Sequence, residues 1–348
     1  MTVILTTSLI GLTGCDKGGA KFSIASTQSQ FQQAATFVPR KLDVLFVVDN
    51  SGSMKTSQTA LASNFPSFIK YFKDKGYNFR LAVTTSDAYY GDQFINSGCS
   101  LCNVGQTEFR ASADASAGMP IRVVSNSTPN LESIFSANVQ VGTNGSGDER
   151  VFSSFKAALS SPLNIEFHRP DAYLAVIMIS DEEDFSHDDI NRNESYTQPT
   201  LHPVINYKTF LETFTNGKSA TDFSVSTISV LDTDCRTQLG NTGQKISLRL
   251  MELVDLTGGT KNSLCAAFDT ALDNISANIA SSNQAQFKIN RQPIISSIRV
   301  IIDGIIVPQD STNGWTYDAT TMLITVHGSY SPQAGASIVI NFDPETVN

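Results

Sequence analysis

An aspartate and two serines alternate directly after a short apolar run: Asp49, Ser51 and Ser53 follow residues 43–48. A carboxylate and two hydroxyls offer one anionic and two neutral oxygen ligands, which suit a hard cation such as Mg²⁺. Mg²⁺ prefers octahedral oxygen coordination and usually keeps positions for water or for another molecule. A site with so few carboxylates would leave one coordination position for a group that the protein does not supply.

The residues around this motif predict where it lies in a fold. Residues 43–48 form a continuous apolar run with β-branched side chains, which is typical of a parallel strand that is buried on both faces. A helical stretch follows from Ser53 to Lys75, with apolar residues at helical spacing and Gly76 at its end. Because open α/β sheets bind ligands at the carboxyl ends of their strands, the motif lies where a ligand site is expected.

Strands and helices continue to alternate along residues 41–281, and this alternation predicts an α/β domain with a doubly wound, mostly parallel sheet. The expected strands are 79–85, 121–125, 173–180 and 223–230, and the expected helices are 129–138, 150–159, 204–214, 246–256 and 268–279.

The pattern changes in residues 282–348, where no helical period is found. Apolar residues alternate over 298–302, Asp303-Gly304 follows, and apolar residues return at 305–307, which together indicate a β-hairpin. Further short strands are expected at 315–317, 322–326 and 337–342. These features predict a small all-β domain of the sandwich type.

The segment Phe46-Val47-Val48-Asp49-Asn50-Ser51-Gly52-Ser53-Met54 resembles the opening of a von Willebrand factor A (VWA) domain, with its DxSxS metal-ion-dependent adhesion site. The resemblance extends over residues 42–280 in the order of elements. It implies two further ligands, a threonine in a loop before a helix and an aspartate at the end of the fourth strand. Asp181 matches the second. For the first, Thr143 in the loop 142–147 is favoured, and Ser146 is the alternative.

In the VWA family, a protein ligand supplies an Asp or Glu carboxylate to the vacant position of the bound ion. The resemblance therefore implies a divalent cation, Mg²⁺ or else Mn²⁺ or Ca²⁺, and adhesion or another protein–protein interaction. Catalysis would need a base or nucleophile at the metal, and the chain has no G-x-S-x-G elbow, H-E-x-x-H motif or P-loop. We therefore expect a binding protein and not an enzyme.

Two other functions remain open. A hydrolase would use the same metal to activate water, with Glu182 or Glu183 as the base. A structural protein of the envelope would use the metal only to hold loops together. The acidic run Glu182, Glu183 and Asp184 after Asp181 is interpreted as a solvated loop, and the alternative is a second cation site that binds Ca²⁺.

The first residues indicate export. Residues 2–12 are apolar but too short to span a bilayer, as in a secretory signal, and they end in Leu12-Thr13-Gly14-Cys15. This tetrapeptide resembles the bacterial lipobox, in which the Cys thiol receives a diacylglycerol. We therefore expect residues 1–15 to be a lipoprotein signal and Cys15 to anchor the protein to a membrane of the bacterial envelope, with the membrane and its face undetermined. Residues 16–40 are expected to form a flexible tether.

The other cysteines predict disulfides. The chain has five cysteines, and without Cys15 an even number remains, which in an exported protein indicates disulfide bonds. Cys99 and Cys102 lie close together in a Gly- and Ser-rich stretch and are expected to form a local bridge, which leaves Cys235 and Cys265 as a pair. Sequence alone does not fix this connectivity. The net charge of -9 makes nucleic acid an unsuitable partner.

Overall fold

A computed structural model describes residues 31–36, 41–97, 106–113, 120–170, 172–240, 243–282, 285–332 and 335–345. The predicted signal at 1–15, the lipidation of Cys15, residues 16–30 and 37–40 of the predicted tether and the Cys99–Cys102 bridge lie outside these ranges.

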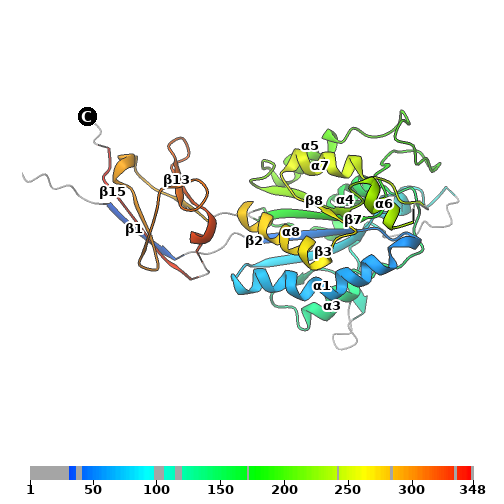
Figure 1. The fold of residues 1–348 in the computed structure, drawn as a ribbon, viewed down its shortest axis with the longest axis horizontal. Coiled ribbons are helices and arrows are strands. Elements are labelled where there is room, and N and C mark those ends of the chain that lie inside the picture. The colour runs from blue at the N-terminus through cyan, green and yellow to red at the C-terminus, as the bar shows by residue number, and fades with distance from the viewer. Residues whose placement is uncertain are drawn as a thin grey trace, which may run out of the picture.

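In the described part of the chain, a six-stranded sheet forms the centre of residues 41–282, with the strand order β6-β3-β2-β7-β8-β9 (Figure 1). All neighbouring strands in this sheet pair in parallel except β6, which runs antiparallel to β3 at one edge. The strands are β2 (Lys41–Val48), β3 (Phe79–Thr85), β6 (Val124–Ser125), β7 (Ala172–Ser180), β8 (Phe223–Ser229) and β9 (Lys261–Ser263).

Helices cover both faces of this sheet (Figure 1). One hydrophobic core joins one face to α1 (Lys55–Asp74), α3 (Leu131–Asn138) and α8 (Phe268–Ser282). A second core joins the other face to α4 (Val151–Ser160), α5 (Ile205–Thr215) and α7 (Leu248–Thr257). Smaller elements are α2 (Ala88–Gln93), β4 (Ser112–Ala113), β5 (Pro120–Ile121) and α6 (Thr233–Gln238).

The continuous apolar runs of the sequence are explained by these two cores. Successive residues of a strand point to opposite faces, so that Val44 and Phe46 pack into the first core while Leu45 and Val47 pack into the second. Every residue of β7 is buried for the same reason. The predicted mixed α/β organisation with a mostly parallel sheet is therefore confirmed.

The remaining described strands form antiparallel sheets around a third core in residues 285–342. One sheet has the order β1-β15-β11-β12 and the other β10-β14-β13. Their bounds are β1 (Phe31–Thr36), β10 (Ala285–Lys288), β11 (Arg299–Ile302), β12 (Ile305–Val307), β13 (Trp315–Asp318), β14 (Leu323–Val326) and β15 (Ser337–Phe342).

The hairpin predicted at Asp303-Gly304 joins β11 to β12, with Ile302 paired to Ile305. Both turn residues have a positive φ, 48° for Asp303 and 82° for Gly304. This left-handed backbone matches the twist of the flanking strands and explains why an Asp-Gly pair is suited to the turn.

One strand lies where the sequence predicted a flexible tether. Phe31–Thr36, within the segment 16–40, forms β1 and pairs antiparallel with β15, Phe31 opposite Phe342 and Thr36 opposite Ser337. The tether prediction is wrong for these six residues. The sequence FQQAAT has no clear alternation of apolar residues, and the strand is instead defined by backbone pairing with a segment about three hundred residues away.

Within the described residues, no helix has both the length and the apolar character needed to cross a membrane.

Candidate metal centre

Two aspartates lie side by side at the carboxyl edge of the six-stranded sheet. β2 and β7 pair in parallel with Val48 opposite Ile179, so Asp49 and Asp181 leave neighbouring strands at the same edge. The backbone amide of Asp49 donates to the carbonyl of Ile179 at 3.0 Å. Both side chains are buried, with exposed fractions of 0 % and 4 %. The parallel pairing thus brings together two carboxylates that the sequence separates widely.

The two serines of the motif connect these aspartates. The hydroxyls of Ser51 and Ser53 lie 3.1 Å apart, and the Ser53 hydroxyl donates to Asp181 Oδ1 at 3.1 Å. Asp49 is held by the amide of Ser51, which donates to Oδ1 at 2.7 Å, and by the hydroxyl of Ser180, which donates to Oδ2 at 2.6 Å. Four of the five predicted ligands therefore form one continuous polar cluster.

Helix capping does not account for the hydroxyl of Ser51. Ser51 precedes a short 3₁₀ helix, Gly52–Met54, but its side chain makes no capping hydrogen bond there. α1 itself begins after Met54, whose side chain has no cap function either. The hydroxyl faces Ser53 instead, as an oxygen ligand would.

The loop that carries Thr143 and Ser146 lies beside this cluster. The amide of Gly145 donates to the carbonyl of Asn50 at 2.7 Å. Gln58, on α1, uses its buried amide group to donate both to the carbonyl of Asp49 at 2.9 Å and to that of Gly142 at 2.7 Å. These bonds hold the loop against the segment that contains Asp49.

The side chains of Thr143 and Ser146 are not joined to the cluster. In the ranges that the structure describes, no hydrogen bond links either hydroxyl to the four residues Asp49, Ser51, Ser53 and Asp181. The hydroxyl of Ser146 instead accepts from the amide of Asp148 at 3.0 Å. The geometry therefore does not choose between Thr143 and Ser146 as the loop ligand.

A residue that the sequence analysis did not select lies in the same loop. Glu149 is fully buried, and neither of its carboxylate oxygens has a hydrogen-bond partner. Burial raises its pKa well above the ordinary value, and repulsion from Asp49, Asp87 and Glu182 adds to the shift. In the sequence, Glu149 lies between Asp148 and Arg150 and has the pattern of an ordinary charged loop, so no local signal distinguishes it.

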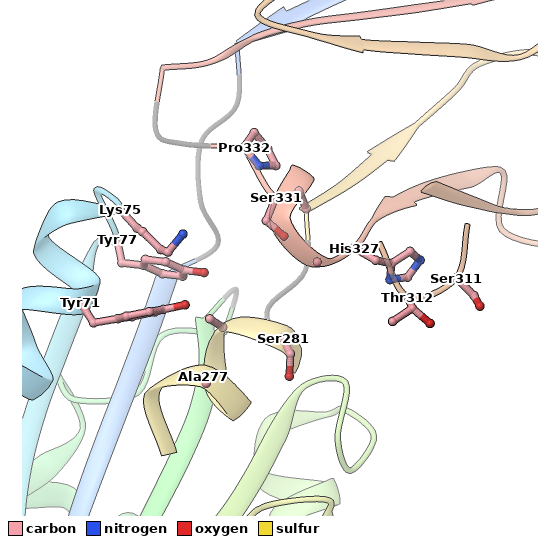
Figure 2. Close-up of a pocket in the computed structure, with 13 residues that line it drawn as sticks. Tyr71, Lys75, Tyr77, Ala277, Ser281, Ser311, Thr312, His327, Ser331 and Pro332 are labelled. Carbon is pink, nitrogen blue, oxygen red and sulfur yellow. The ribbon is translucent and has the colours of Figure 1, made fainter. Parts of the chain in front are cut away.

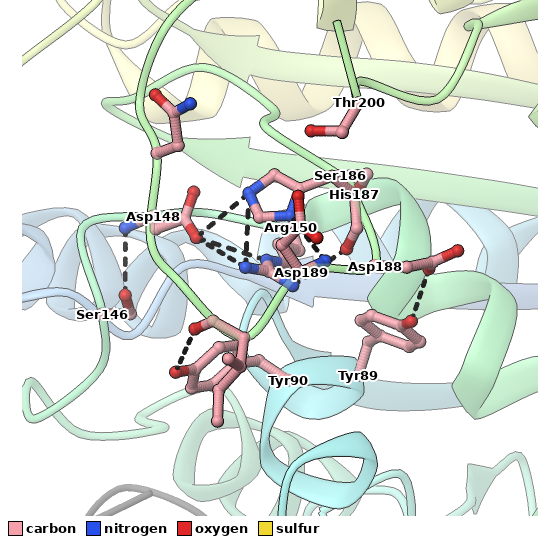
Figure 3. Close-up of polar contacts among 12 residues, drawn as sticks. Tyr89, Tyr90, Ser146, Asp148, Arg150, Ser186, His187, Asp188, Asp189 and Thr200 are labelled. Carbon is pink, nitrogen blue, oxygen red and sulfur yellow. Dashed lines mark hydrogen bonds and ion pairs between the residues drawn. The ribbon is translucent and has the colours of Figure 1, made fainter. Parts of the chain in front are cut away.

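The charged neighbours of Glu149 form a network of their own (Figure 3). Arg150 is fully buried; its Nη2 lies 2.9 Å from Asp148 Oδ2, and its Nη1 donates to the carbonyl of His187 at 2.9 Å. The guanidinium also stacks over the ring of Tyr90, 4.8 Å from the centroid. Arg150 therefore compensates Asp148 and fixes the loop, while Glu149 has no such partner.

The two carboxyls of the cluster and that of the neighbouring Glu182 are harder to ionise than they would be in water. Burial, followed by repulsion from Asp181, raises the pKa of Asp49 to about 7, although hydrogen bonds from Ser180 and Ser51 oppose the shift. Burial also raises the pKa of Asp181. Burial and then repulsion from Asp49 raise the pKa of Glu182 to about 8. A bound cation would favour the charged form of all three carboxyls.

The acidic run after Asp181 has two parts with different surroundings. Glu182 borders the cluster, and its Oε2 is buried without a hydrogen-bond partner. Glu183 accepts from the amide of Arg249 at 2.9 Å, at the start of α7. Asp184 accepts from the amide of Phe152 at 2.9 Å, at the start of α4, and pairs with the guanidinium of Arg249 at 3.1 Å.

The interpretation of this run as a solvated loop is therefore wrong, because Glu183 and Asp184 are both fully buried. Their oxygens satisfy backbone amides in the first turns of two helices, where negative charge is favoured. The carboxylates of Glu183 and Asp184 therefore have a structural role at the starts of these helices.

The cluster fits a hard cation only if hydroxyls take part. Within the described ranges, no three His, Cys, Asp or Glu side chains converge closely enough to hold a metal ion by themselves. Asp49 and Asp181 would need the oxygens of Ser51 and Ser53 to complete a ligand set. A donor set made only of oxygen suits Mg²⁺, Mn²⁺ or Ca²⁺ and not the softer metals.

The predicted pair of Cys235 and Cys265 forms a disulfide, with a Cα–Cα distance of 5.5 Å. The bond joins α6 to the residues that follow β9, at the same edge of the sheet as the cluster. The segment after α6 returns to Asp181, where the amide of Lys245 donates to its carbonyl at 3.2 Å and the Gln244 side chain approaches Oδ2 at 3.4 Å.

A cavity of about 460 Å³ lies elsewhere in the molecule (Figure 2). Tyr71, Lys75 and Tyr77 line it near the start of β3, at the amino edge of the sheet, and His327 and Ser331 line it from the antiparallel unit. It is therefore at the opposite edge from the aspartate cluster.

No protein-family model matches the chain, and no curated protein matches it. Among solved structures, the chain is similar to the pilus adhesin SpaC from Lactobacillus rhamnosus GG in its open conformation, with 13 % identity and a TM-score of 0.42 over 89 % of this chain and 40 % of that chain. It is also similar to proximal thread matrix protein 1 from the mussel byssus, with 10 % identity and a TM-score of 0.36 over 75 % of this chain and 51 % of that chain. The chain thus spans less than half of the SpaC structure and about half of the mussel protein. Because these similarities are low, a function for this chain must rest on its own residues.

Proposed function

We propose that residues 41–281 form a VWA-type domain that binds a divalent cation, Mg²⁺ or else Mn²⁺ or Ca²⁺, and through it a carboxylate of a protein partner. The ligands would be Asp49, Ser51, Ser53 and Asp181, with an oxygen from the loop that contains Thr143. The observation that supports this most is the polar cluster at the ends of β2 and β7. In it, the Ser53 hydroxyl contacts the Ser51 hydroxyl and donates a hydrogen bond to Asp181.

The chain's own residues would prepare the site in three ways. The hydrogen bonds from Ser180 and Ser51 orient the Asp49 carboxylate before any ion arrives. Gln58 keeps the neighbouring loop in place. Burial excludes water from the anionic oxygens, which strengthens their attraction for a cation. When bound, the cation would supply a positively charged position that an Asp or Glu side chain of a partner can occupy.

We also propose that the protein acts at the bacterial cell envelope, anchored to a membrane by a lipid on Cys15. Adhesion or another protein–protein interaction suits a binding site on an anchored domain. Several acyl chains hold a protein at a membrane more firmly than a single one. Labelling cells with a fatty-acid probe should mark the wild type and not Cys15→Ala, and equal labelling of both would contradict the anchor.

Binding of a protein partner is favoured over hydrolysis of a substrate as the function of this site. Of the two bases considered for a hydrolase, Glu183 is engaged with the first turn of α7. Glu182 borders the cluster and is the remaining candidate base. Turnover of phosphoester or peptide substrates by the Mg²⁺-loaded protein, abolished in Glu182→Gln, would replace the binding function with the hydrolase.

The partner is tested by capture from envelope or host-cell extract on the immobilised protein, in Mg²⁺ and in EDTA. We expect proteins that are retained in Mg²⁺, released by EDTA and not retained by Asp49→Asn. Replacement of the exposed Asp318 by Asn, in the antiparallel unit, serves as a control that leaves the site intact. If retention survives both EDTA and Asp49→Asn, the metal has only a structural role.

A further inference from the structure

Glu149 is a buried carboxylate, and neither of its oxygens makes a hydrogen bond. Buried polar atoms in folded proteins nearly always make a hydrogen bond, and a buried charge that is left unpaired is strongly destabilising. Glu149 has an exposed fraction of 0 %, and both Oε1 and Oε2 are without a hydrogen-bond partner. The Ser86 hydroxyl is near enough to oppose the rise in the pKa of Glu149, but it donates to Asn50 Oδ1 at 3.2 Å. Such a group is either kept protonated by its surroundings or paired with a cation when it is charged.

The surroundings of Glu149 make this requirement stronger. Asp49, Asp87 and Glu182 are all close enough to repel its carboxylate. The arginines of this region are used by other acids, since Arg150 pairs with Asp148 and Arg249 with Asp184. Within the described ranges, no ion pair is made by Glu149. Lys245 partly offsets the charge of Glu182, and Arg192 partly offsets that of Asp87, but the groups that act most strongly on Glu149 include no basic side chain.

The position of Glu149 in its loop also places it at the edge of the sheet where Asp49 lies. It lies at the end of the loop that begins at Gly142, and that loop is bonded to Asn50 and, through Gln58, to Asp49. On its other side, the buried pair of Arg150 and Asp148 fixes the backbone before α4 begins. The loop therefore presents Glu149 to the same edge of the sheet as Asp49.

We propose that Glu149 is a direct ligand of the cation, in the place for which the sequence suggested Thr143 or Ser146. This inference rests on the proposed function, because it assumes that a divalent cation binds at Asp49 and Asp181. It changes the chemistry of the site, because the ligand set would hold three carboxylates and two hydroxyls instead of two carboxylates and three hydroxyls. Within the described ranges no three acidic side chains lie close enough to hold a metal by themselves, so the Glu149 carboxylate would move toward Asp49 and Asp181 as the ion binds. A greater negative charge in the ligand set raises the affinity for divalent cations.

Calorimetric titration of the full chain with Mn²⁺ tests the proposal. We expect Glu149→Gln to weaken Mn²⁺ binding at least tenfold, because an amide keeps the shape of the side chain but removes its charge. Thr143→Val and Ser146→Ala are expected to bind Mn²⁺ as the wild type does. Equal binding by the wild type and Glu149→Gln, or a tenfold loss in Thr143→Val, would overturn the assignment of Glu149 and leave the proposed function intact. Absence of Mn²⁺ binding by the wild type would overturn both.

Thermal unfolding distinguishes a ligand from a residue that only supports the fold. In EDTA, Glu149→Gln should melt at or above the temperature of the wild type, because repulsion from Asp49, Asp87 and Glu182 is removed. With Mn²⁺, its melting temperature should rise less than that of the wild type. Glu183→Gln is the matched control: it weakens bonds to the amides of Arg249 and Leu250 and should lower the melting temperature equally in EDTA and in Mn²⁺. The same behaviour in Glu149→Gln would show that Glu149 is structural.

Discussion

At the scale of single residues, Asp49 has an environment that is hard to explain without a cation. Its carboxylate is fully buried, accepts hydrogen bonds from Ser51 and Ser180, and lies beside a second aspartate. Hydrogen bonds favour the charged form, but burial and repulsion disfavour it more. An environment of this kind is costly for the fold and is typical of functional sites.

Asp49→Asn should remove the stabilisation that divalent cations give. A ligand that binds only the folded state stabilises it by about 2.7 kcal/mol at one hundred times its dissociation constant. The wild type should therefore melt higher in saturating Mg²⁺ than in EDTA, whereas Asp49→Asn should melt at the same temperature in both. Differential scanning calorimetry measures this directly. A wild type without any Mg²⁺- or Mn²⁺-dependent shift would contradict the metal site.

The stability of the protein in EDTA should fall as the pH rises from about 4 to about 8. The pKa of Asp49 is raised from 3.8 to about 7 and that of Glu182 from 4.5 to about 8, so the folded state binds more protons than the unfolded state between these values. Stability is then lost with rising pH, because at higher pH the chain must either protonate these two carboxyls as it folds or bury them in their charged form. Saturating Mg²⁺ should reduce this loss, because the ion replaces the protons. Urea denaturation at several pH values, with EDTA and with Mg²⁺, provides the measurement, and a flat profile in EDTA would contradict the prediction.

At the scale of elements, the loops after β2, β7 and β8 are fastened to one another around the cluster. Gln58 of α1 bonds to the loop before α4, and the segment after α6 reaches Asp181 through Gln244 and Lys245. The disulfide between Cys235 and Cys265 closes this edge of the sheet beside β9. The elements thus fix the loops in place, and the loops in turn carry the proposed ligands.

Replacing both cysteines of this disulfide by serine should destabilise the fold. The two residues are 30 positions apart in the sequence. Opening a loop of this size costs about 3 to 4 kcal/mol in the chain-entropy description of disulfides. Chemical denaturation of Cys235→Ser/Cys265→Ser and of the wild type gives the difference in unfolding free energy. As the control, both proteins are measured again with reductant, which opens the bond in the wild type. A change of less than about 1 kcal/mol would mean that the loop is held without the bond.

At the scale of the whole molecule, β1 makes the antiparallel unit discontinuous in sequence. β1 precedes the parallel sheet in the chain, yet it pairs with β15 near the other end. Residues 41–282 are therefore inserted between two parts of the antiparallel unit, and β1 is an edge strand of its four-stranded sheet. Both ends of the α/β domain are connected to this unit.

Removing residues 1–40 should weaken the antiparallel unit and leave cation binding unchanged. Without β1, the backbone groups of β15 that pair with it lose their partners, and an exposed strand edge of this kind favours association with other chains. We expect residues 285–345 to become more sensitive to proteolysis, while Mn²⁺ titrates the shortened chain as it does the full chain. Unchanged protease resistance would show that β1 contributes little to the unit.

The sequence by itself determined the features that depend on neighbours along the chain. Alternating and continuous apolar runs predicted the strands and helices of residues 41–281, because burial on one or both faces imposes a period that is visible locally. The DxSxS motif at the end of a buried strand placed Asp49, Ser51 and Ser53, and Asp303-Gly304 located the hairpin. The small number of cysteines made Cys235 and Cys265 the expected pair, and the structure then established that bond.

Tertiary structure decided the features that depend on partners far away in the chain. The contact of Ser53 with Asp181 joins residues 128 positions apart. Glu183 and Glu149 belong to similar charged stretches in the sequence, but Glu183 meets the backbone amides of α7 whereas Glu149 meets other carboxylates. β1 was missed because a strand held by backbone pairing needs no apolar pattern of its own. The identity of a residue fixes which bonds it can make, and only the fold determines which partners reach it.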